Sequence, residues 1–80
     1  MEPSEAYQKI KAYGQNTALE IKYLIGSERR KLECTAHGYC GALDATTLTF
    51  ITNREEGLKD VIGLERIVSI KQSDDVRDVA

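Results

Sequence analysis

The stretch that decides the fold is Val61-Ile62-Gly63-Leu64-Glu65-Arg66-Ile67-Val68-Ser69-Ile70-Lys71. β-branched residues dominate both of its ends, which predicts two short strands. Between them, Leu64-Glu65-Arg66 is predicted to form one 3₁₀ turn. Two strands joined by so tight a connector are typical of small antiparallel sheets that curl into a closed or nearly closed barrel.

Upstream of this stretch, apolar residues recur with a period of two, which indicates half-buried strands. Gly38 and Gly41 interrupt the longest of these runs, and glycine inside a strand often marks a bulge or a sharp bend. That run is therefore predicted to be one long, strongly bent strand. With the stretch above, the predicted strands cover residues 17–25, 31–43, 47–52, 58–62 and 67–70.

Three connectors separate the first four strands. Residues 26–31 are predicted to form the first hairpin loop, residues 44–46 a turn, and residues 53–57 a second hairpin loop with glycine at its end. Because these connections are short, consecutive strands are expected to pair as antiparallel neighbours.

A helix of about ten residues is predicted before the strands, with Ser4 as its N-cap and Gly14 at its end. Its apolar residues recur at helical spacing and form one stripe. A helix this short is marginal in water by itself, so the stripe should pack against the sheet. The stripe consists of Ala6, Tyr7, Ile10 and Tyr13.

The predicted fold class is α+β, mainly β: an N-terminal helix followed by a five-stranded antiparallel barrel of the SH3 or Sm type. A Greek-key oligonucleotide-binding barrel fits less well, because it usually carries a helix between its third and fourth strands. Residues 1–71 are expected to form a single domain, and residues 72–80 an acidic, disordered tail.

Composition narrows the classes of function. The chain of 80 residues has a formal net charge of −2, all of it in the tail, so residues 1–71 carry ten basic and ten acidic side chains. A neutral domain offers no broad surface for nucleic acid. No apolar run approaches the ~20 residues that span a bilayer, and the acidic start lacks a signal peptide's apolar segment. We therefore expect no membrane partner, and a cytoplasmic location with free thiols.

Cys34, His37 and Cys40 are the residue types that bind zinc. Positions three apart on a strand point to opposite faces, and the chain has no other cysteine or histidine to complete a ligand set. We therefore interpret them as a core thiol, an exposed imidazole and a thiol at the bend. No metal, no cofactor and no catalytic residue is predicted, and the chain is not expected to be an enzyme.

Glu28-Arg29-Arg30-Lys31 concentrates positive charge in the first hairpin loop. Arginine there could hold a phosphate or a carboxylate, with Tyr39 and His37 as a stacking surface for a base. The alternative is a solvated loop that discourages aggregation, and the neutral charge of the domain favours this alternative. Arg66 is a second candidate ligand contact; its alternative is a surface arginine beside the 3₁₀ turn.

Two elements resemble those of WYL domains, the ligand-sensing barrels of bacterial transcription regulators. Ile21-Lys22-Tyr23 matches the Ile-x-Tyr strand of that family, and Leu64-Glu65-Arg66-Ile67 matches its Leu-x-Arg-Ile element. The resemblance implies a barrel whose Tyr23 and Arg66 contact a ligand. The Trp-Tyr-Leu signature falls at Thr46-Thr47-Leu48, where only the leucine is retained, and Ile62 stands in place of an expected arginine.

Gly41-Ala42-Leu43-Asp44, followed by Thr47-Leu48-Thr49-Phe50, resembles the first motif of Sm and Hfq-type RNA-binding proteins. The size and acidity of the chain also resemble those of the Rho-binding antiterminator family. Together these resemblances imply a non-enzymatic regulatory barrel that binds a nucleotide or a single strand of nucleic acid. The alternative is a protein-interaction module that acts through a barrel edge or by self-association.

Overall fold

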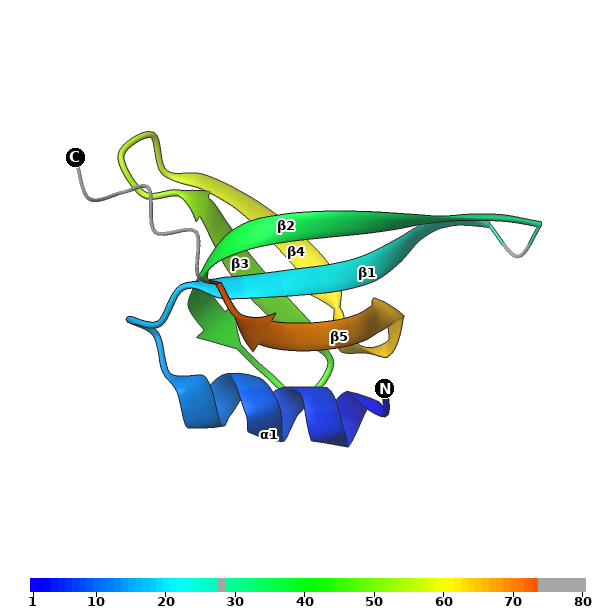
Figure 1. Ribbon diagram of the computed structural model, residues 1–80, viewed down its shortest axis with the longest axis horizontal. Helices are drawn as coiled ribbons and strands as arrows, with labels where there is room; N and C mark the ends of the chain where they lie inside the picture. Colours follow the sequence, from blue (N-terminus) through cyan, green and yellow to red (C-terminus); the bar gives the residue numbers. More distant parts are fainter. Residues whose placement is uncertain (28, 74–80) are drawn as a thin grey trace.

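The computed structural model describes residues 1–27 and 29–73, which form one helix and five strands (Figure 1). The helix comes first, and a 3₁₀ turn separates the last two strands, as the sequence predicts. In chain order the elements are α1 (Pro3–Tyr13), β1 (Leu19–Ser27), β2 (Arg30–Leu43), β3 (Thr47–Asn53), β4 (Leu58–Gly63), η1 (Leu64–Arg66) and β5 (Ile67–Gln72).

All five strands belong to one antiparallel sheet in the order β4-β3-β2-β1-β5. The predicted helix followed by five antiparallel strands is therefore confirmed. The expected closure of the sheet into a barrel is not found. β4 and β5 lie at opposite edges and do not pair with each other in the described residues. The sheet is strongly bent but open, because η1 carries the chain from one edge to the other without joining them.

The bend of the sheet lies in β2, the one strand that pairs along different parts of its length with two different neighbours. Its first part, up to Gly38, pairs with β1, and its last part, from Tyr39, pairs with β3. A register shift separates Cys40 from Ala42 in the second pairing. A side chain at Gly38 would overlap the carbonyl oxygen of Ile51, so β3 approaches β2 closely there. The long bent strand predicted from the two glycines is confirmed.

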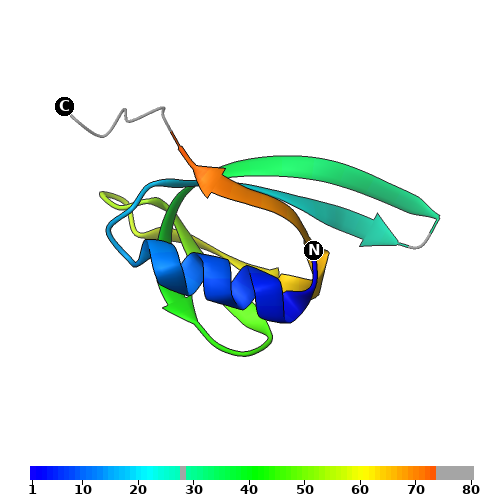
Figure 2. The same ribbon diagram turned by 60° about the horizontal axis from the view of Figure 1, so that its bottom comes forward.

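α1 lies across the inner side of the bent sheet, where it packs on β5 and η1 (Figure 2). Ala6 and Ile10 are fully buried, while Tyr7 and Tyr13 are half-buried against the same core. The remaining buried core comes from every strand and from η1, and consists of Leu19, Ile21, Cys40, Leu48, Phe50, Ile62, Leu64, Ile67 and Ile70.

The start of α1 differs from the sequence prediction. The helix begins at Pro3, so its N-cap is Glu2 instead of Ser4, and the cap carries no side-chain hydrogen bond. Proline fits the first helical position because its missing N–H has no partner there in any helix. Gly14 ends the helix as predicted: its φ is 84° and its N–H donates to the carbonyl of Ile10 at 3.1 Å.

The first hairpin also differs from the prediction. Ser27 pairs with Arg30 and Gly26 with Lys31, so both flanks of the predicted loop over residues 26–31 are strand. The pairing of β5 with β1 ends at Tyr23, and that of β3 with β2 begins only at Tyr39. Residues 24–27 and 30–33 therefore project from the body as a two-stranded hairpin, seen at the right of Figure 1 and called the arm below.

The end of the sheet runs past the predicted domain boundary at residue 71. Gln72 is still part of β5, and the buried Ser73 donates its N–H to the carbonyl of Ala18 at 2.9 Å. The tail predicted for residues 72–80 therefore begins, in its first two residues, as ordered structure. Its remainder, residues 74–80, lies outside the described residues.

Candidate interaction site on the projecting hairpin

The apolar face of the sheet, which is buried in the body, continues onto the arm, where it is exposed. On β1, Leu19 and Ile21 are fully buried, whereas Ile25 on the same face is 40% exposed. On β2 the same face runs from buried Cys40 to Leu32, which is 65% exposed. Ile25 and Leu32 are directly paired across the hairpin. Two large, exposed aliphatic side chains thus lie side by side on the arm.

Both strands of the arm also lack an outer neighbour among the described residues. The hydrogen bond from Ser73 to the carbonyl of Ala18 shows which way the main chain alternates. Even-numbered residues of β1 direct their main-chain groups toward β5, so odd-numbered ones bond β2. Since Leu19 pairs with Gly38, even-numbered residues of β2 bond β1. Lys31 and Glu33 therefore turn their N–H and C=O groups outward, as an unpaired strand edge does.

The charged side chains of the arm have no charged partner within the described chain. Arg30, Lys31 and Glu33 are exposed, and none of them forms an ion pair there. Across the hairpin, Lys31 faces Gly26 and Glu33 faces Leu24, so neither meets an opposite charge. Arg29 is exposed at the tip, while Glu28 lies outside the described residues.

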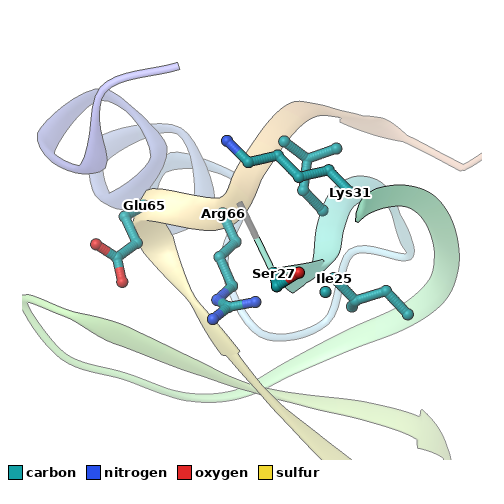
Figure 3. Close-up of a pocket in the computed structure, with 7 residues that line it drawn as sticks. Ile25, Ser27, Lys31, Glu65 and Arg66 are labelled. Atoms are coloured by element: carbon teal, nitrogen blue, oxygen red, sulfur yellow. The ribbon is translucent and has the colours of Figure 1, made fainter. Parts of the chain in front are cut away.

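A shallow pocket of about 290 Å³ lies where the base of the arm meets η1 (Figure 3). Two of the predicted site residues, Lys31 and Arg66, line it together with Glu65 and with Ile25 to Ser27 of β1. The two cations carry no ion pair in the described chain, so the pocket suits one small anionic group, such as a carboxylate. It is open and lined mainly by exposed residues, which favours a weak or accessory contact.

Tyr23 is half-buried near the base of the arm, opposite Cys34 of β2 and Ile67 of β5. Burial raises the pKa of its phenol above the usual value, with a further contribution from the nearby Cys34. Tyr23 packs against the core, although it was predicted as a ligand contact, and it is not among the residues that line the pocket.

His37 lies on the outer face of the sheet, away from the arm. Its Nε2 is 3.7 Å from Oε1 of Glu20, and its Nδ1 is 3.3 Å from the hydroxyl of Ser73. Lys71 completes the row, with its Nζ 3.1 Å from Oε2 of Glu20. The three residues come from neighbouring strands, so their contacts link β2, β1 and β5 side by side.

Tyr39 is a poor platform for a stacked base on one side, because the guanidinium of Arg54 lies 3.5 Å from the centre of its ring. Arg54 is held there by a second contact, a 3.3 Å hydrogen bond from its Nη2 to the carbonyl of Gln15. Arg54, in the β3–β4 turn, therefore contacts both Tyr39 of β2 and the connector after α1.

The structure thus brings together only part of the predicted site. Lys31 and Arg66 share a pocket, Arg29 and Arg30 lie further out at the tip of the arm, and the remaining three residues, Tyr23, His37 and Tyr39, have their own contacts elsewhere. The exposed apolar pair on the arm, Ile25 and Leu32, was not predicted from the sequence. Leu32 between Lys31 and Glu33 shows the ordinary alternation of a half-buried strand, so the sequence carries no signal of its exposure.

The two thiols are separated. Cys34 is half-buried near the base of the arm and Cys40 is buried at the bend, where burial raises the pKa of its thiol. In residues 1–27 and 29–73, no three side chains of His, Cys, Asp or Glu gather as a metal site would require. Over the same residues, α1 is the one α-helix and is too short and too polar to cross a bilayer.

Comparisons with models of protein families, with curated proteins and with solved structures find no match to this chain.

Proposed function

We propose that this chain is a non-enzymatic protein-interaction module that binds an extended polypeptide by strand addition to the arm. The observation that carries the proposal is the free outer edge of β2 at Lys31 and Glu33, beside the exposed pair of Ile25 and Leu32. Strand addition uses main-chain hydrogen bonds for affinity and neighbouring side chains for specificity. The arm offers both on one element.

The scatter of the other candidate residues supports this choice over a nucleic-acid site. A single-strand binder combines a basic groove with stacking aromatics on the same surface. Here the basic residues Arg29 and Arg30 lie at the tip of the arm, whereas Tyr39 pairs with β3 at the other end of β2 and is covered on one face by Arg54. The basic side chains and the aromatic ring therefore do not share one surface, as binding of single-stranded nucleic acid requires.

The test separates main-chain from side-chain binding at one position. A displayed library of extended peptides is selected on the immobilised wild-type protein, and the affinity of the selected peptides is then measured by fluorescence anisotropy. Glu33→Pro removes the outward N–H without removing a bond of the hairpin, and Glu33→Ala is the matched control that removes only the side chain.

Glu33→Pro should weaken peptide binding by about tenfold or more, because the partner's carbonyl then loses its donor as it is buried. Glu33→Ala should bind within a few-fold of wild type. Circular dichroism melting curves confirm that both variants fold. A library that yields no binding peptide, or equal affinity for Glu33→Pro and Glu33→Ala, contradicts the proposed function.

A further inference from the structure

The free edge of β2 is complementary in charge to itself. Lys31 and Glu33, the two residues of the arm's β2 strand with outward main-chain groups, carry opposite charges, and Leu32 lies between them. When two identical strands pair antiparallel about a two-fold axis, each residue faces the one at the same distance on the other side of the axis. The position of the axis therefore decides which charges meet.

We compare two-fold axes at each of residues 31 to 34. Each of these four registers places outward main-chain groups of one copy opposite outward main-chain groups of the other. An axis at Lys31 or at Glu33 places that residue opposite its own copy, so that like charges meet, which is destabilising. An axis at Cys34 places Glu33 opposite Thr35 and Lys31 opposite His37, which forms no pair of opposite charges. An axis at Leu32 places Lys31 opposite Glu33 of the second copy, and does so twice by symmetry.

We propose that a second copy of this chain is the polypeptide that adds to the arm, with β2 pairing antiparallel to β2 and Leu32 on the two-fold axis. This inference rests on the proposed function and names its partner. The pairing joins two open sheets into one continuous sheet. It needs only residues 30–34, which end well before Tyr39, where β3 begins to pair with β2.

The apolar face of the arm supports the same register. Lys31 and Glu33 form the hydrogen-bonded pairs, so the two copies of Leu32 form a non-hydrogen-bonded pair, in which side chains lie closest. Ile25 flanks Leu32 within each copy. The result is a strip of four aliphatic side chains across the new sheet, in which Leu32, the most exposed apolar residue of the arm, lies opposite its own copy.

Lys31 and Glu33 are available for this role. Neither forms an ion pair in the described chain. Lys31 also borders the pocket at η1. The residue opposite it is Gly26, so no side chain holds it on that side of the hairpin, and its long stem can turn toward the outer edge.

Charge reversal tests the register, with sedimentation equilibrium as the readout. Lys31→Glu and Glu33→Lys each place like charges opposite each other in a homodimer, so each should raise the dimer dissociation constant by about tenfold. An equimolar mixture of the two variants should form a heterodimer of near wild-type affinity, because the new carboxylate of one chain faces the new ammonium of the other. Melting curves of the separate variants confirm that both fold.

Cross-linking tests the position of the axis. The Cα atoms of a non-hydrogen-bonded pair lie ~4.5 Å apart, within the range that a disulfide spans. Leu32→Cys in a Cys34→Ser background should therefore form an interchain disulfide under mild oxidation. The native Cys34 lies opposite Arg30 in this register and should not form one in the unsubstituted chain.

Three results would overturn the inference: a wild-type chain that stays monomeric at about 1 mM, unchanged dissociation constants for both charge variants, or an interchain disulfide at Cys34 in place of position 32. The wild-type chain could instead be monomeric and still bind selected peptides, with binding lost in Glu33→Pro. That result would contradict the dimer but support the proposed function. The two ideas therefore fail separately.

Discussion

Gly38 shows how one residue shapes the sheet. β2 must pass within contact distance of the main chain of β3 at this point, and a Cβ atom would overlap the carbonyl oxygen of Ile51. Backbone atoms in a paired strand cannot shift as a flexible side chain can, so no larger residue fits without moving β3. The bend between the two halves of the sheet therefore depends on the absence of a side chain here.

Gly38→Ala should lower the free energy of unfolding by about 2–3 kcal/mol, as expected when an atom is forced into a packed site. Gly63→Ala is the matched control: its backbone is extended, with φ of −68°, and the atoms nearest to a Cβ there are side-chain atoms of Glu65 and Arg66 at 3.9 Å, an ordinary contact distance. The control should change stability by less than about 1 kcal/mol. Urea unfolding curves measure both, and equal effects would refute the steric argument.

At this scale the sequence predicts burial well only where a residue's environment is local. Leu48 and Phe50 are fully buried as the period-two pattern indicates. The same pattern cannot separate buried Ile21 from exposed Ile25, because both lie on one face of β1 and their burial depends on which distant elements pack there. The contact of Arg54 with Tyr39 was likewise out of reach, since it depends on how two distant segments are brought together.

Among the elements, the β2–β3 turn is the one most completely explained by its own residues. Asp44 Oδ1 accepts hydrogen bonds from the N–H groups of Thr46 and Thr47, each at 2.8 Å. Oδ1 and Oδ2 also accept from the hydroxyls of Thr46 and Thr47, at 3.1 Å and 2.9 Å. The main-chain bond from Thr46, followed by those from Thr47, lowers the pKa of Asp44 from 3.8 to about 2. This turn was predicted because aspartate favours such local bonds.

The lowered pKa of Asp44 predicts a pH dependence of stability. A carboxyl group with a folded-state pKa below its unfolded value stabilises the fold above the unfolded pKa, and this contribution is lost as pH falls through the folded value. Between about pH 5 and pH 2, wild type should therefore lose more stability than Asp44→Asn, which keeps an acceptor oxygen but does not titrate. Urea midpoints at several pH values provide the comparison. Parallel curves for the two proteins would contradict the assignment.

The first hairpin is the element for which sequence reasoning was wrong. The run of charges from residue 28 to 31 looked like a loop, because charged side chains usually mark solvent-exposed segments. In the structure Arg30 and Lys31 continue β2, since a strand that projects from the body is exposed on both faces and can carry charge on either one. Charge indicates exposure, but exposure does not by itself distinguish a loop from a projecting strand.

The molecule as a whole consists of a packed body and a thin extension. Its extents are 41 × 24 × 21 Å, and Figure 1 shows the arm along the longest direction. The body has a helix and both halves of the sheet around one core, whereas the arm has two strands and no cover. An isolated two-stranded hairpin is marginally stable in water, so the outer part of the arm should open more readily than the body.

Hydrogen exchange at low protein concentration should show this difference. The N–H groups of Ile25 and Leu32, which bond within the arm, should be protected at least roughly a hundredfold less than those of Ile21 and Phe50 in the body. Measurement by NMR on the dilute chain keeps self-association from protecting the arm. Uniform protection across the four residues would show that the arm is as stable as the body.

The packing of α1 on η1 and β5 has a consequence for how the chain folds during synthesis. The helix is translated before all five strands, but the surface that covers its apolar stripe is made from residues 64–72, more than fifty residues later. β1 likewise cannot complete its pairing on one edge until β5 has been translated. The ribosome must therefore release nearly all of the described chain before α1 can dock, so this fold is completed in one late step.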